Sequence, residues 1–270
     1  MWSDQIESDP VPKGETIFPR NHLLRSLPRD ELERLVPLLH VVPLSRRRIL
    51  QHAGVPIDHV YFIEDGLISV LAKTDDCDAV EVWLIGRDGV VGIEALLGIE
   101  TTTLSHFVQI GGSALRIAVR DLNCAMSKSS NLRAALHGYV HAALMQSSQS
   151  AACSLKHAFE QRLARWLLTA QDRVELDALP ITQELLARSL GVHRPTVSAT
   201  SKVLQGRGIF VKERGLIRIV DRSALERLAC RCYRTMALSR NLWQRSETRR
   251  KLVVALSVLG AVLEVELWVQ

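Results

Sequence analysis

Seven polar side chains between residues 182 and 202 have the chemistry to bind a polyanion. They are Thr182, Gln183, His193, Arg194, Thr196, Ser198 and Lys202. Arg194 offers paired N–H donors that match a phosphate or the edge of a guanine, Lys202 offers a compact positive charge, and short hydroxyls suit phosphate oxygens. The chain shows no nucleophile elbow, phosphate-binding glycine loop or metal-ligand spacing, so we expect no catalytic residues and no enzymatic activity.

The residues around this set predict two helices joined by a tight turn. Thr182 is placed to cap the first helix, which ends at Gly191 because glycine accepts the left-handed backbone conformation of a turn. The second helix opens with Pro195 in its first turn, where proline lacks only an N–H that has no partner in the helix. We expect its inward face to be formed by Val197, Val203 and Leu204. We expect its outward face to be formed by Arg194, Thr196, Ser198, Ala199 and Lys202.

A hairpin is expected after the second helix. Residues 209–211 and 216–220 are β-rich runs on either side of the polar segment Lys212-Glu213-Arg214-Gly215. Two helices, a turn glycine and a following hairpin form a winged helix-turn-helix, whose second helix is typically placed in the major groove of DNA. The alternative interpretation is the same fold used for protein contacts only.

Upstream, residues 41–118 have the pattern of a β domain. The β-rich runs are 60–63, 67–71, 80–85 and 107–110. Turn residues, among them Asp65-Gly66 and Gly111-Gly112, separate these runs. Closely spaced short strands predict a jelly roll, or double-stranded β-helix, because a parallel α/β sheet needs longer helical connections. Before this domain, residues 23–39 predict two short helical turns broken by Pro28.

Residues 121–171 predict one long helix, because they contain no proline or glycine pair and are rich in Ala, Leu, Gln and Ser. Seven of these residues follow alternating spacings of four and three, which is typical of a helix that packs along a partner helix. They are Leu132, Leu136, Tyr139, Ala143, Gln146, Ser150 and Cys153. We favour a dimer helix, and the alternative is an amphipathic helix that packs on its own domain.

Several segments resemble the Crp/Fnr-type transcription regulators. The DNA-binding domain of that family is similar to residues 181–187 (ITQELLA), 191–198 (GVHRPTVS) and 204–208 (LQGRG), and residues 160–168 (EQRLARWLL) resemble the end of its long helix. The Asp65-Gly66 turn, the β domain and the order of the domains also resemble those of this family. The resemblance covers roughly residues 21–236. It implies a homodimer with a sensory β-roll and a long dimer helix, and a recognition helix in the major groove of an inverted-repeat DNA operator. RNA polymerase is expected as a further partner.

We therefore expect an α+β chain with five parts. They are a flexible arm (1–20), a cyclic-nucleotide-binding-like sensor β-roll (21–120), a long dimer helix (121–171), a winged helix-turn-helix (172–236) and a basic, then hydrophobic tail (237–270). Residues 156–251 contain 20 Lys and Arg against 9 Asp and Glu, whereas the rest of the chain contains 14 against 20. A basic C-terminal region indicates contact with a polyanion.

The sensor lacks the cation that a cyclic nucleotide requires. Relatives that bind cyclic nucleotides carry a Gly-Glu pair followed about ten residues later by Arg-Ser or Arg-Thr, because the cyclic phosphate is an anion. The matching stretch, residues 89–105, keeps its glycines, but no Arg or Lys occurs between Gly89 and Arg116. A phosphate would instead meet Glu94 and Glu100, at a high cost in desolvation. We expect that cyclic AMP is not the signal, and the effector stays unknown.

The cysteines and histidines indicate no cofactor or metal. The five cysteines are Cys77, Cys124, Cys153, Cys230 and Cys232. Their odd number and irregular spacing argue against a disulfide framework, and they match no iron–sulfur or four-ligand zinc pattern. The nine histidines show no pair at a ligand spacing on one predicted face. The Cys230-Arg231-Cys232 segment has the thiols for redox chemistry, but ordinary thiols are the preferred interpretation.

The two ends of the chain bear on its location. The N-terminus has no basic segment followed by an apolar stretch, so we expect no signal peptide and a cytoplasmic protein. The tail 252–269 is almost wholly apolar and follows Arg249-Arg250-Lys251, like the flank of a membrane span. Glu264 and Glu266 interrupt it, so we expect it to form a helix or strand that packs on the protein or on its dimer mate. The tail also supports an alternative function, a regulatory or scaffold module that binds a protein or membrane partner.

Overall fold

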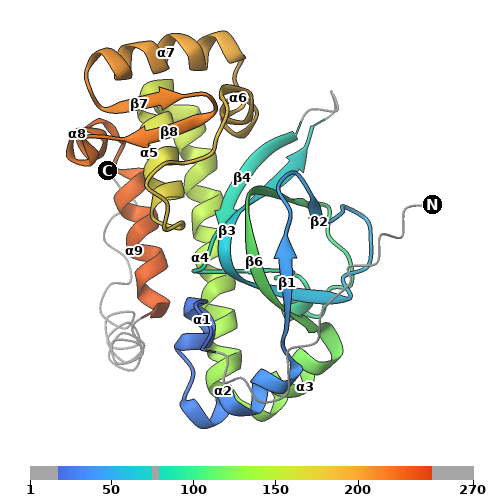
Figure 1. Cartoon of the computed structure of the whole chain (residues 1–270). Helices are drawn as coiled ribbons and strands as arrows, with labels where there is room; N and C mark the ends of the chain where they lie inside the picture. The colour runs from blue at the N-terminus through green and yellow to red at the C-terminus, as the bar shows by residue number, and fades with distance from the viewer. Residues whose placement is uncertain (1–17, 75–78, 245–270) are drawn as a thin grey trace, which may run out of the picture.

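The structure, a computed structural model, describes residues 18–74 and 79–244. Helix α4 (Ser130–Lys156) runs beside a β-roll, and α9 (Cys232–Gln244) packs along α4 (Figure 1). The helix-turn-helix unit lies at one end of α4 and the first short helices lie at the other (Figure 1). The expected α+β class is confirmed.

The β-roll is one curled antiparallel sheet. Its strands are β1 (His40–Leu44), β2 (Ile49–Gln51), β3 (His59–Lys73), β4 (Ala79–Ile85), β5 (Val90–Val91) and β6 (Ser105–Ala118). The main strand order is β1-β6-β3-β4, with β2 paired to β6 and β5 paired to β3. The sheet buries a continuous apolar core that includes Phe62, Ile68 and Val108. The predicted β-roll is therefore confirmed.

Strands β3 and β6 are longer than the sequence predicted. The expected turns at Asp65-Gly66 and Gly111-Gly112 are wrong, because β3 and β6 run through them. Gly66 has a φ of +93°, and a Cβ there would lie 2.6 Å from the carbonyl oxygen of Ile110. A Cβ on Gly112 would lie 2.3 Å from the carbonyl oxygen of Asp65. These glycines allow the paired strands to bulge and bend in mid-strand without ending.

The N-terminal segment is held against the β-roll. Helices α1 (His22–Arg25) and α2 (Arg29–Leu35) flank Pro28, as predicted, and two 3-10 helices, η1 (Val36–Leu38) and η2 (Ala95–Leu97), occur later. The backbone N–H of Arg20 donates to Glu64 at 2.7 Å, and the amide of Asn21 donates to the carbonyl of Gly89 at 2.9 Å. The predicted flexible arm therefore does not extend to Arg20, and residues 1–17 lie outside the described residues.

The predicted single helix over 121–171 is wrong. The structure has three helices there, α3 (Val119–Lys128), α4 and α5 (Phe159–Gln171). Ser129 adopts an extended backbone, and its hydroxyl accepts a hydrogen bond from the N–H of Leu132 at 2.9 Å, so it caps α4 and ends α3. His157 is also extended and ends α4.

The seam predicted on α4 packs within its own chain. Leu132, Leu136, Tyr139 and Ala143 belong to the core of the β-roll. Cys153, near the other end of the seam, is fully buried. The interpretation of these residues as a dimer seam is therefore wrong, and the alternative, an amphipathic helix on its own domain, holds for them.

The core of the helix-turn-helix unit also includes Leu67, Leu84 and Ile110 from the β-roll. The unit consists of α5, α6 (Gln183–Leu190), α7 (Arg194–Gly206), β7 (Phe210–Glu213), β8 (Leu216–Ile219) and α8 (Arg222–Leu228). Trp166, Leu204 and Phe210 are at most 2% exposed in this core. The boundary predicted at residue 236 falls inside α9, and the remaining predicted tail, 245–270, lies outside the described residues.

A buried ion pair joins the β-roll to this unit. Arg173, just after α5, lies 3.2 Å from Asp88, in the connection between β4 and β5, and both side chains are less than 10% exposed. The guanidinium of Arg173 also donates to the side chain of Gln146 on α4 at 2.9 Å and to the carbonyl of Thr169 at 3.2 Å. The pair therefore fixes three parts of the chain at one point.

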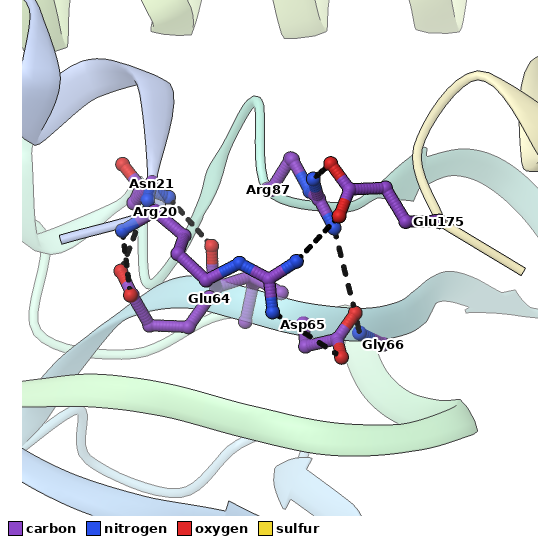
Figure 2. Close-up of polar contacts among 8 residues, drawn as sticks. Arg20, Asn21, Glu64, Asp65, Gly66, Arg87 and Glu175 are labelled. Carbon is purple, nitrogen blue, oxygen red and sulfur yellow. Dashed lines mark hydrogen bonds and ion pairs between the residues drawn. The ribbon is translucent and has the colours of Figure 1, made fainter.

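A second, more exposed group of charges lies beside it. Figure 2 shows Arg87 between Glu175, which follows α5, and Asp65 on β3. Arg20 also donates to Glu175, at 2.6 Å. Because Glu175 is exposed, these pairs orient the segments more than they stabilise them.

Glu81 of β4 forms a third contact with the unit. Its carboxylate accepts hydrogen bonds from the indole N–H of Trp166 at 2.6 Å and from the hydroxyl of Ser69 at 2.7 Å. Desolvation raises the pKa of Glu81 to about 7, although hydrogen bonds from Ser69, Trp166 and Ser189 and the charge of Arg165 oppose the shift. The contact therefore favours a protonated carboxyl.

We predict that Glu81 makes the protein less stable as the pH rises. Its folded pKa lies above its ordinary value of 4.5, so its stabilising contribution is complete below pH 4.5 and is lost as the pH rises through about 7. Because solvent reaches part of the residue, we expect a loss of about 2 kcal/mol from this group between pH 5 and pH 8.

The measurement is urea unfolding of the wild type and Glu81→Gln at pH 5 and pH 8. Glu81→Gln should remove this part of the pH dependence, whereas the control Glu184→Gln, an exposed carboxylate on α6, should keep it. Equal pH dependence in the wild type and Glu81→Gln would contradict the prediction.

Candidate nucleic-acid interface

The first helix of the pair begins and ends as its sequence predicts. The Thr182 hydroxyl accepts a hydrogen bond from the N–H of Leu185 at 3.2 Å and caps α6. Gly191 has a φ of +60°, and its backbone ends the helix. The N–H of Val192 donates to the carbonyl of Ala187 at 3.0 Å and closes the turn. These local bonds fix the angle at which α7 leaves the turn.

The inward face of α7 differs from the prediction at one position. Val197, Ser201 and Leu204 are buried, at spacings of four and three. Val203 is 48% exposed, so the prediction that it faces inward is wrong. Residues 203 and 204 are about 100° apart around a helix, so a face centred on Leu204 leaves Val203 at its outer edge.

The outward face of α7 combines short apolar surface with positive charge. Pro195, Thr196, Ala199, Lys202 and Val203 are exposed. Small apolar groups fit the methyl group of thymine in the major groove, and Lys202 can reach phosphate. Val203 therefore belongs to the exposed face of α7, a position that the spacing of Val197, Ser201 and Leu204 predicts.

The structure places the other predicted contact residues around the starts of the two helices. His193 is the N-cap residue of α7, and Arg194 is the first residue of that helix; both side chains are exposed. Ser198 is half-buried at the edge of the outward face, and Thr182 and Gln183 are half-buried at the start of α6. The N–H groups of a helix start favour an anion at this position.

The predicted wing is a two-stranded hairpin. Strands β7 and β8 pair in antiparallel register, with Glu213 opposite Leu216. The turn residues Arg214 and Gly215 have φ values of 21° and 83°. Positive φ at both central residues suits a two-residue hairpin turn. Arg214 and Arg218 are exposed, so the hairpin adds positive charge beside α7.

The β-roll contacts the turn between α6 and α7. A Cβ on Gly191 would lie 3.8 Å from Val80 at the start of β4. A groove of about 610 Å³ continues from there to Arg188, His193 and Arg194. The start of α7 therefore lies close to the β-roll, so a movement of the β-roll would displace the start of α7.

A comparison with family models agrees with this geometry. Residues 161–228 match the Crp-like helix-turn-helix domain. The match includes all seven polar residues that the sequence singled out, from Thr182 to Lys202. A comparison with curated proteins gave no match.

Solved regulator structures share this fold. FixK2 from Bradyrhizobium japonicum has a TM-score of 0.63 at 16% identity and covers 71% of this chain and 98% of its own. The c-di-GMP-responsive global regulator CLP from Xanthomonas campestris has a TM-score of 0.60 at 18% identity, covering 71% and 99%. A CRP-family transcriptional regulator from Thermus thermophilus has a TM-score of 0.58 at 18% identity, covering 69% and 95%.

Within residues 18–74 and 79–244, no helix combines the length and the apolar character needed to cross a membrane. The apolar tail 252–269 lies outside the described residues.

We predict that Arg194→Ala weakens binding to a DNA duplex selected by the wild type, by about 1–3 kcal/mol, because a paired contact to guanine is lost. Lys202→Ala should weaken binding to selected and scrambled duplexes equally, because a phosphate contact carries no sequence information. Fluorescence anisotropy titrations at two salt concentrations measure both effects. The control is Arg29→Ala, an exposed arginine on α2. Wild-type affinity of Arg194→Ala for the selected duplex would refute this placement of α7.

Proposed function

We propose that the chain is a DNA-binding transcription regulator of the Crp/Fnr type, which binds an inverted-repeat operator as a homodimer without using cyclic AMP as its signal. The observation that carries this proposal is the outward face of α7, which begins with the exposed Arg194 and continues with short side chains and Lys202. A cytoplasmic location follows from the proposed DNA target.

The contacts proposed for this face follow from side-chain length and charge. Arg194 reads the O6 and N7 atoms of a guanine or clamps a phosphate. Thr196 and Ser198 are short and contact phosphate oxygens or a thymine methyl group, with Val203 and Ala199 beside them. Thr182 and Gln183 contact backbone phosphates at the N-terminus of α6. His193 lies at the rim of the same face.

Pro195 changes the proposed half-site. Relatives that read a TGTGA-like half-site commonly have a glutamate directly after the equivalent arginine, where it accepts a hydrogen bond from a cytosine amino group. Pro195 has no acceptor in its side chain. The half-site should therefore differ at that base, while the two half-sites remain about one helical turn apart.

A second stripe on α4 is the proposed dimer surface. It follows spacings of three and four on the face turned away from the core. Its residues are Ala134, His137, His141, Leu144, Ser148, Ala151 and Leu155, and all are exposed. Leu144 is 59% and Leu155 84% exposed, so two large apolar side chains lie on this stripe. This pattern is typical of two helices packed along each other, so a second copy of α4 is the proposed occupant.

The interior of the sensor does not suit a cyclic phosphate. Glu94 accepts a hydrogen bond from the Thr102 hydroxyl at 2.6 Å, and its other carboxylate oxygen is buried without a hydrogen-bond partner. His106 is fully buried, and desolvation lowers its pKa to about 4, so its ring is neutral. A carboxylate and a neutral imidazole provide no cation for a phosphate.

The space between α4 and Gly89, the first residue of the stretch 89–105 that corresponds to the phosphate-binding segment of relatives, is also filled. A Cβ on Gly89 would lie only 2.3 Å from the hydroxyl of Tyr139 on α4. The cavity lined by Asp88, Tyr139, Gln146 and Arg173 measures about 10 Å³. Small-molecule sites commonly measure about 300–1,000 Å³, so this cavity has no room for a nucleotide.

The proposed function is tested by selecting duplexes from a random library with the full chain and then titrating the selected sequence at several salt concentrations. We expect an inverted repeat and an affinity that falls steeply with salt, because phosphate contacts release counterions. Failure to enrich any sequence, or binding that does not depend on salt, would favour the alternative module for a protein or membrane partner.

We predict that Leu144→Glu converts the dimer to a monomer. The substitution would place two carboxylates in the proposed seam, at a cost of about 3 kcal/mol or more, which is more than 100-fold in the dimer dissociation constant. Sedimentation equilibrium measures this constant. The control Leu97→Glu changes an exposed leucine on the β-roll and should leave the dimer intact. An unchanged dimer in Leu144→Glu would exclude this stripe as the interface.

We predict that cyclic AMP and cyclic GMP bind no better than about 1 mM, a free energy near −4 kcal/mol. The reason is the anionic and filled interior around Glu94 and Tyr139. Isothermal titration calorimetry with the full chain measures the affinity. Micromolar binding of either nucleotide would contradict the prediction.

A further inference from the structure

Four side chains from two distant parts of the chain meet where α4 ends. They are Cys153, His157, Cys230 and Cys232, and one ligand atom from each lies within 4.8 Å of all the others. The sulfur of Cys153 lies 3.5 Å from that of Cys230, and the sulfur of Cys232 lies 3.6 Å from Nδ1 of His157. The three cysteines are at most 5% exposed.

Helix geometry explains how the cluster forms. Cys153 and His157 are four residues apart at the end of α4, so they lie on the same side of the helix. Cys230 follows α8, and Cys232 is the first residue of α9, which packs along α4. Two pairs of residues separated by 73 or more positions thus converge.

The composition of the cluster is unusual for ordinary packing. The three cysteines form a buried group separate from the two large apolar cores. The amide of Gln149, one turn before Cys153, donates a hydrogen bond to the sulfur of Cys232 at 3.0 Å. Such an outer hydrogen bond orients and stabilises a metal-bound thiolate.

The distances match a tetrahedral ion. An ion about 2.3 Å from sulfur and about 2.1 Å from nitrogen places its four ligand atoms about 3.6–3.8 Å apart. We propose that Cys153, His157, Cys230 and Cys232 bind one Zn²⁺ ion. A Cys3His set supplies all four ligands from protein and leaves no open position, which is typical of a structural site rather than a catalytic one.

A disulfide explains less of the cluster than a metal does. The nearest sulfur atoms, of Cys153 and Cys230, would have to approach to about 2.05 Å, and an oxidant would have to remove two electrons and two protons. That reaction would leave the thiol of Cys232 and the imidazole of His157 without a role. A single Zn²⁺ ion uses all four groups without any change in oxidation state.

The position of the proposed zinc site links it to DNA binding, and this link rests on the proposed function. His157 ends α4 immediately before α5, the first helix of the helix-turn-helix unit. Cys230 and Cys232 follow the last helix of that unit. The ion therefore ties both ends of the DNA-binding unit to the end of α4, and its removal should weaken DNA binding.

The test uses the full chain, purified under reducing conditions without a histidine tag or a chelator. Elemental analysis should find about one zinc per chain. Replacement by Co²⁺ should give sulfur-to-cobalt charge-transfer absorption and the intense visible bands of tetrahedral Co²⁺. Both readouts are independent of DNA, so failure of the proposed function would leave them unchanged.

Matched variants locate the site. Cys153→Ser and Cys232→Ser should lose the ion, whereas Cys124→Ser, which changes an exposed cysteine on α3, should retain it. His157→Cys should also retain the ion and shift the Co²⁺ spectrum towards four thiolates, which keeps the test valid if a serine variant fails to fold.

Three results would overturn the proposal. They are a folded wild-type protein without stoichiometric zinc after growth in zinc-supplemented medium, iron in place of zinc, and a Cys153–Cys230 disulfide in the freshly purified protein. If the zinc is present but its removal leaves DNA affinity unchanged, the step from the ion to the orientation of the DNA-binding unit is overturned.

Discussion

The buried ion pair between Asp88 and Arg173 is the interaction on which the arrangement of this molecule depends. It joins the β-roll to the DNA-binding unit, and the bond from Arg173 to Gln146 adds α4. Removing one partner of such a pair leaves a buried charge and costs about 3–5 kcal/mol. Because the turn at Gly191 also rests on the β-roll, this junction sets where α7 presents its outward face.

Helix α4 serves three purposes with three parts of its surface. Its inner face, which includes Leu136 and Tyr139, completes the core of the β-roll. Its outer stripe around Leu144 is exposed and is the proposed surface for a second copy, and its last turn supplies Cys153 and, beside it, His157 to the proposed zinc site. A signal that moves the β-roll against α4 would therefore act on the dimer surface and on the DNA-binding unit together.

The sequence predicted those features that depend on local rules. The Thr182 cap, the Gly191 turn and the hairpin after Gly208 follow from backbone preferences within a few residues. The break at His157 carries no proline or glycine signal, and the passage of β3 through Gly66 depends on a partner strand. The proposed zinc ligands could not be predicted from the sequence, because their convergence requires α9 to pack on α4, which no local spacing encodes.

The most direct test of the account is a hydroxyl-radical footprint of the full-length protein on its selected duplex. Two recognition helices from one dimer should protect two symmetric patches on the same face of the DNA, with centres about 34 Å apart. Protection of a single patch, or of an uninterrupted tract without symmetry, would contradict the proposed dimer and the placement of α7 in the major groove.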